Sequence, residues 1–86
     1  MIKLWGKILK DNKIKKDYTI SIEEFSFENL YDYLKDMCYN LKIETPIILP
    51  KHLRQFEEYS ITRFYSGDFI DYIDFDFLQI EYYDDK

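Results

Sequence analysis

The sequence predicts a single α+β domain: an antiparallel sheet of about four strands, packed on one amphipathic helix, with a second short helix. Apolar residues alternate at period two near both ends of the chain, in residues 2–22 and 77–83, which is typical of strands. Between them, residues 26–41 carry an apolar stripe at helical spacing. A chain of 86 residues can build one hydrophobic core and not two. We therefore expect residues 1–86 to form one domain, with residues 84–86 frayed.

The first 22 residues predict a β-hairpin, the first two strands of the sheet. In the first strand Leu4 and Ile8 share one face, and Trp5 and Leu9 share the other. The pair that follows, Asp11-Asn12, tolerates positive φ at both positions, as a tight hairpin turn requires. The return strand alternates in the same way as the first.

Residues 26–41 predict the amphipathic helix. Ser26 is a suitable N-cap and Glu28 lies in the first turn. Cys38 is the only cysteine, so an intrachain disulfide is excluded. Its thiol could be a nucleophile, but its position on the apolar stripe favours a buried and inert side chain. The stripe consists of Leu30, Leu34, Met37, Cys38 and Leu41.

The second half of the chain begins with an extended segment between two prolines, residues 45–50. A short helix over 51–59 follows, with Pro50 at or near its first position. Residues 60–65 predict the third strand, which the turn signal Ser66-Gly67-Asp68 closes.

The last part of the chain contains one segment without a clear pattern. In residues 69–75, aspartates alternate irregularly with aromatic residues, so neither strand nor helix is favoured. Residues 77–83 alternate regularly and predict the last strand.

Charge is distributed unevenly along the chain, whose net charge is −5. Residues 1–16 hold six lysines and one aspartate, whereas residues 66–86 hold seven acids and one lysine. If the first hairpin lies beside the last strand, these opposite charges become cross-strand neighbours. The net negative charge argues against nucleic acid as a partner. The basic residues 1–16 are the one part of the chain to which this argument does not apply. We expect a cytoplasmic protein, because no segment has the pattern of a signal peptide or of a membrane span.

Two candidate sites of chemistry have a simpler structural interpretation. His52 is the only histidine, and no nucleophile or acid accompanies it in a motif, so we expect a solvated residue at a helix start. Four aspartates in the C-terminal region could hold Mg²⁺ or Ca²⁺ if the fold gathered them, but they lack the EF-hand pattern. They are better interpreted as a solubilising face: Asp68, Asp71, Asp74 and Asp76.

Arg63 lies inside the third predicted strand, just before the acidic segment. One interpretation is an internal ion pair with an aspartate of that segment. The other is an arginine that binds an anion or a partner protein, assisted by Lys51, His52 and Arg54 if the short helix packs nearby.

A candidate interaction surface follows from the one-sided packing of the sheet. If one helix covers one face, then Trp5, Leu9, Phe77 and Tyr83 lie on the other, and Arg63 accompanies them. Aromatic residues framed by charges are typical of protein-binding surfaces. The alternative is that the short helix or residues 69–75 cover them.

Several strings of the sequence carry a family resemblance. They are Leu4-Trp5-Gly6-Lys7-Ile8, Thr62-Arg63-Phe64, Asp68-Phe69-Ile70 and Ile73-Asp74-Phe75-Asp76. On these strings the chain resembles, over most of its length, a small bacterial family from clostridia-like Firmicutes. That family has no assigned activity, so the resemblance implies no functional residues.

These observations favour a non-catalytic module that binds or regulates another protein through the open sheet face or a strand edge. We expect no enzymatic activity, no catalytic residues, no metal and no cofactor. An acidic inhibitor or immunity-type protein that blocks a basic site is the first alternative. A small ligand- or metal-binding domain that uses Arg63 and nearby aspartates is the second. A bare sheet edge would also allow a homodimer.

Overall fold

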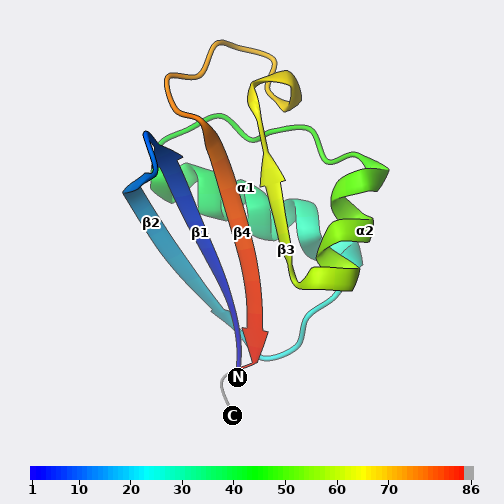
Figure 1. Cartoon of the computed structure of the whole chain (residues 1–86). Coiled ribbons are helices and arrows are strands. Elements are labelled where there is room, and N and C mark those ends of the chain that lie inside the picture. Colours follow the sequence, from blue (N-terminus) through cyan, green and yellow to red (C-terminus); the bar gives the residue numbers. More distant parts are fainter. Residues whose placement is uncertain (85–86) are drawn as a thin grey trace.

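The computed structural model describes residues 1–84 and has two main layers, a four-stranded antiparallel sheet and a helix across one of its faces (Figure 1). The strand order is β2-β1-β4-β3. This arrangement confirms the predicted fold class. The elements are β1 (Ile2–Lys10), β2 (Lys13–Ile22), α1 (Leu30–Leu41), α2 (Pro50–Tyr59), β3 (Ile61–Phe64) and β4 (Phe77–Asp84).

The hairpin of β1 and β2 turns at Asp11 and Asn12, as predicted. Their φ angles are 54° and 64°, so both central residues are left-handed, the combination that suits the twist of a two-residue hairpin. The strand register shifts once, between Ile8 and Leu9, where β2 contains one extra residue.

The centre of the sheet pairs the basic first strand with the acidic last strand. β1 runs antiparallel to β4 from Ile2 opposite Asp84 to Leu9 opposite Phe77. The Lys7 ammonium lies 3.1 Å from a carboxylate oxygen of Glu81, so the uneven charge is partly matched across strands, as expected. Asp84, expected to fray, belongs to β4, whereas residues 85–86 lie outside the described residues.

A short 3₁₀ turn (Phe27–Asn29) leads into α1. The hydroxyl of Ser26 caps it by accepting a hydrogen bond from the Glu28 N–H at 3.2 Å. The predicted apolar stripe of α1 faces the sheet and is buried throughout. Cys38 on this stripe is fully buried, and burial raises the pKa of its thiol to about 12, against a smaller lowering by a hydrogen bond with Thr45.

Gly6 of β1 allows α1 to approach the sheet closely. A Cβ atom at this position would lie 2.5 Å from the sulfur of Met37, closer than non-bonded atoms come. Met37 is itself only 1% exposed, so its side chain has little room to move aside.

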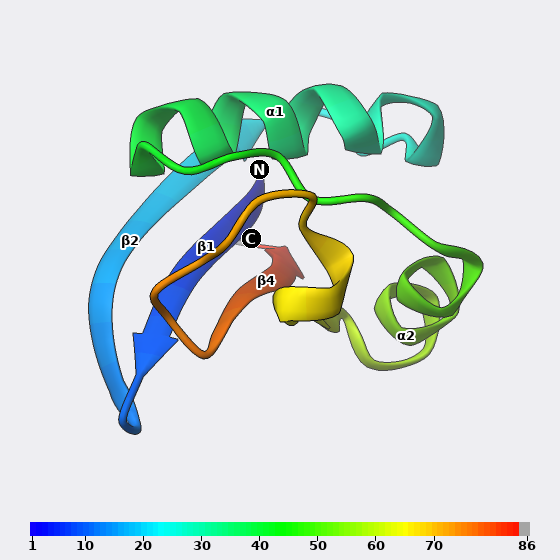
Figure 2. The ribbon, with the colours of Figure 1, turned by 90° about the horizontal axis from the view of Figure 1, so that it is seen from above.

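The remaining segments close the core at two sides. α2 lies beyond the edge strand β3 (Figure 1), and its residues Phe56 and His52 are buried. Residues 69–76, which we call the acidic loop, run irregularly over the end of the sheet at which the hairpin turns (Figure 2). Phe69 anchors the start of this loop in the core, and the Asp76 N–H donates to the Leu9 carbonyl at its end. Within residues 1–84, no helix covers the second face of the sheet.

Candidate interaction surface

All five residues predicted for the interaction surface lie on the sheet face opposite α1, which we call the open face. In β1, the buried residues Leu4 and Ile8 point to α1, so the residues between and beside them point away. The strand register then places β4 and β3 residues in rows beside them. The predicted residues on this face are Trp5, Leu9, Arg63, Phe77 and Tyr83.

Trp5 and Lys7 begin a chain of polar contacts across the open face. The indole N–H of Trp5 donates to Asp17 on β2 at 3.0 Å. The Lys7 ammonium lies 3.9 Å from the centroid of the Trp5 ring and also donates to Glu81. A cation over an indole ring is attracted by the negative ring face, so Trp5 is held on both its edge and its face.

Gln79 continues this chain to the edge strand β3. Its amide nitrogen donates to Glu81 at 2.9 Å, and its amide oxygen accepts from Nε of Arg63 at 2.8 Å. Gln79 is buried within the face, so its amide is satisfied on both sides. One connected set of side chains thereby spans the four strands, from Asp17 to Arg63.

Arg63 makes no ion pair within residues 1–84, which contradicts the predicted pair with an aspartate. Its guanidinium carbon lies 5.0 Å from the Phe77 ring centroid, and the centroid of the Tyr65 ring lies 5.4 Å from that of Phe77. The reason is geometric. Strand alternation turns Arg63 outward, while the nearest aspartate in sequence, Asp68, turns inward to a different partner.

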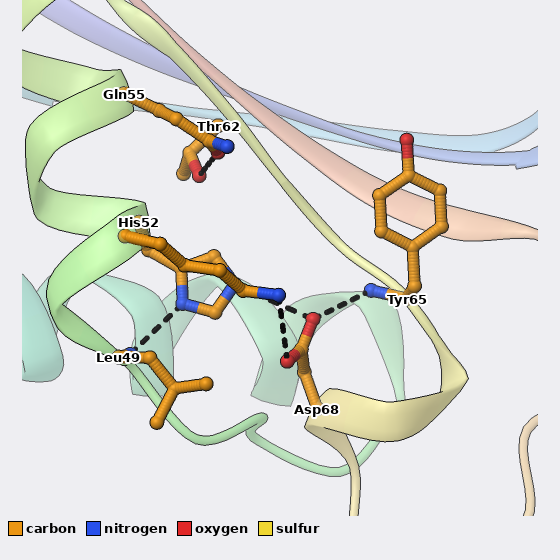
Figure 3. A network of polar contacts seen from close by, with 7 residues as sticks. Leu49, His52, Gln55, Thr62, Tyr65 and Asp68 are labelled. Atoms are coloured by element: carbon orange, nitrogen blue, oxygen red, sulfur yellow. Dashed lines mark hydrogen bonds and ion pairs between the residues drawn. The ribbon is translucent and has the colours of Figure 1, made fainter.

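That partner is His52, whose predicted solvent exposure is wrong (Figure 3). His52 is 1% exposed, and its ring stacks on Phe64 with 4.3 Å between centroids. Its Nδ1 accepts from the Leu49 N–H at 2.9 Å, and its Nε2 lies 3.3 Å from Oδ2 of Asp68. The ring is therefore a neutral tautomer that carries its proton on Nε2.

Asp68 is equally well satisfied in this buried pair. Its Oδ2 also accepts from the Tyr65 N–H at 3.0 Å (Figure 3), and the Lys51 ammonium lies 3.8 Å from Oδ1. Burial is the largest influence on His52 and lowers its pKa, the Asp68 charge and hydrogen bond act to raise it, and the Lys51 charge acts to lower it; the net direction is downward.

The pair of His52 and Asp68 has a structural role. A general base needs a free nitrogen toward its substrate, and both ring nitrogens of His52 are already used inside the protein. The pair joins the start of α2 to the turn after β3. Lys51 and His52, expected to assist Arg63, therefore contact Asp68 instead. The position of His52 in the first turn of α2 could have predicted its hydrogen bond with the Leu49 N–H. Nothing in the sequence indicated that Asp68 would contact the other ring nitrogen.

The acidic loop presents a second exposed surface that the sequence pattern did not resolve. Ile70 is 80% exposed and Tyr72 is 91% exposed, and Asp71 between them is also exposed. The N–H groups of Ile70 and Asp71 both donate to the carboxylate of Glu44, which fixes the backbone at the start of the loop. Within residues 1–84, no group of three His, Cys, Asp or Glu side chains could hold a metal ion.

Comparisons of the chain with protein-family models, with curated proteins and with solved structures found no match. Within the described part of the chain, neither helix has the length and apolar character needed to cross a bilayer.

Proposed function

We propose that this domain is a non-catalytic protein-binding module whose contact surface is the open face of the sheet. The observation that carries the proposal is the pre-arranged set of Trp5, Arg63 and Phe77 on a face that no other described element covers. Aromatic residues and arginine contribute most of the binding energy in protein interfaces.

The contacts within the open face lower the cost of binding. Side chains that are already held by neighbours lose less conformational entropy when a partner docks, and Trp5 and Arg63 are both held in this way. Arg63 uses only Nε inside the described part of the protein, so its two terminal nitrogens remain available to a carboxylate of the partner.

Affinity capture from native lysate with three variants tests this proposal. We expect a specific partner that is retained by wild type and by Arg54→Ala, and lost with Trp5→Ala and Arg63→Ala. Arg54 is exposed on α2, which is not part of the sheet, and controls for the loss of one positive charge. Retention of every partner by Trp5→Ala and Arg63→Ala would exclude the open face.

The acidic loop supports a second candidate function, an inhibitor that blocks a basic site on another protein. Ile70 and Tyr72 protrude between carboxylates, which is the composition that fits an apolar pocket rimmed by positive charge. In the same capture experiment, Tyr72→Ala and Asp71→Asn would then release the partner, and high salt would weaken the complex steeply. Tyr39→Ala is the matched control, since Tyr39 is 81% exposed on α1. A complex that is insensitive to salt and to both loop variants rejects this candidate.

A further inference from the structure

A cleft of about 630 Å³ opens on the helix side of the sheet, beside the hairpin turn. The end of the hairpin, the C-terminus of α1 and the acidic loop form its walls. Its lining contains four of the chain's positive charges, and we call it the basic cleft. These cations are Lys10, Lys15, Lys16 and Lys42.

The register shift in the hairpin gathers two of these lysines. Ile8 pairs with Lys16, but Leu9 pairs with Ile14, so Lys15 is the extra residue of a β-bulge. Strict alternation would place Lys15 and Lys16 on opposite faces of the sheet. The bulge brings both side chains to the same cleft.

The other walls supply Lys42 and fix one ammonium group. Lys42 ends α1 in a left-handed conformation, with φ of 60°. The ammonium of Lys16 donates to the Leu41 carbonyl at 3.3 Å, and so satisfies one of the last carbonyls of the helix. Within residues 1–84, the ammonium groups of Lys10, Lys15 and Lys42 have neither a hydrogen bond nor an ion pair.

The lining therefore carries an uncompensated positive charge. Two carboxylates, Asp11 and Asp74, also line the cleft, which leaves the four cations in excess. The rest of the protein is acidic, because the whole chain has a net charge of −5 with these lysines included. A long polyanion would be repelled outside the cleft, whereas a compact anion inside it meets only the local positive field.

We propose that the basic cleft binds a small molecule that carries a multiply charged phosphate group. Its volume lies within the range of small-molecule sites, roughly 300–1,000 Å³. Lysines act as mobile point charges toward phosphate, and three such groups without partners can converge on one polyphosphate. Ile8, Ile43 and Phe75 give the cleft an apolar part for the remainder of the ligand. The site lies on the helix side of the sheet and is separate from the open face.

Titration of isotope-labelled protein with inorganic pyrophosphate, followed by NMR at low ionic strength, tests the proposal. We expect saturable shifts centred on residues 8–16, 42–43 and 74–75. Lys15→Gln and Lys42→Gln should each weaken binding about tenfold, and Lys35→Gln, which removes an equal charge from the exposed face of α1, should leave the affinity nearly unchanged.

Three outcomes would overturn the proposal. One is the absence of saturation at millimolar pyrophosphate. Another is an equal loss of affinity in Lys35→Gln, which would indicate a diffuse field and no site. The third is binding of duplex DNA without binding of pyrophosphate, lost in the same two variants, which would assign the lysines to a nucleic acid. Circular dichroism spectra identical to wild type establish that the variants are folded.

Discussion

The imidazole of His52 uses both of its nitrogens inside the protein, one toward the backbone of Leu49 and one toward Asp68. A residue in this state couples protonation to unfolding. The unfolded chain releases His52 to water, where its pKa returns to the ordinary value of 6.5. The folded protein keeps it neutral to lower pH, because burial lowers the pKa.

The free energy of unfolding should therefore fall as the pH drops below about 6.5. In that range the unfolded state binds a proton that the folded state does not, so acid favours unfolding until the pKa of the folded state is reached. Urea denaturation between neutral and mildly acidic pH measures this slope. Because His52 is the only histidine, His52→Gln should remove most of it. Equal slopes in both proteins would show that His52 titrates alike in the folded and unfolded states.

Gly6, also at the residue scale, sets how closely Met37 of α1 can approach β1. We expect Gly6→Ala to lower the free energy of unfolding by about 1–3 kcal/mol, because the new methyl group overlaps the buried Met37 side chain. Gly67→Ala is the matched control. No atom lies within 4 Å of the added Cβ and φ is not positive there, so its stability should be unchanged or slightly higher. Thermal denaturation of both variants decides it, and equal melting temperatures would refute the close contact.

At the scale of elements, left-handed residues end both helices. Lys42 follows α1 with φ of 60°, and Ser60 follows α2 with φ of 61°. The Ser60 N–H donates to the Phe56 carbonyl at 2.9 Å, and so closes the last turn before the chain enters β3. A residue with a Cβ atom carries a steric cost in this conformation, which glycine does not.

Ser60→Gly should therefore raise the stability by about 0.5–1 kcal/mol, although it removes a side chain. The opposite sign is expected for Ser21→Gly, because Ser21 lies in β2, where glycine only adds chain entropy to the unfolded state. Chemical denaturation of the two variants measures this difference in sign. Destabilisation by both substitutions would mean that Ser60 is not strained.

The elements were predictable from sequence to the extent that their signals are local. The hairpin turn at Asp11-Asn12, the cap at Ser26 and the stripe of α1 each lie within one element, and the structure confirms all three. The environments of His52 and Arg63 depend on contacts between elements. His52 meets Asp68 sixteen residues away, and no periodicity carries that information. The sheet face of Arg63 followed from alternation, but its partner did not.

The basic cleft was beyond sequence reasoning for the same reason. A β-bulge changes the face of every residue on one side of it, and the pattern of residues 13–16 contains too many lysines to show where alternation breaks. The sequence showed that the first hairpin is basic. Only the tertiary structure shows that its lysines lie next to Lys42 at the end of α1.

At the scale of the whole molecule, Cys38 reports on global unfolding. Its side chain is fully buried in the centre of the core, so a reagent cannot reach the sulfur. Burial also raises the pKa of the thiol to about 12, so the reactive thiolate is not formed near pH 8. We expect no reaction with a thiol reagent in native buffer near pH 8 and complete reaction in denaturant. In Cys38→Ala/Ser66→Cys, whose thiol lies at an exposed position, labelling should be immediate. Rapid labelling of the native wild type would show that the core opens locally.

The pairing of β1 with β4 also has a consequence for the order of events during synthesis. These two central strands come from residues 2–10 and 77–84, so β1 can pair only with β2 until nearly all of this stretch has left the ribosome. The hairpin and α1 can form earlier, but β3 has no strand to pair with before β4 arrives. Contacts that join such distant residues slow folding. Until Asp84 emerges, a nascent chain of this domain therefore exposes one unpaired edge of β1 and the whole of β3. Both are surfaces that a chaperone at the exit tunnel can bind.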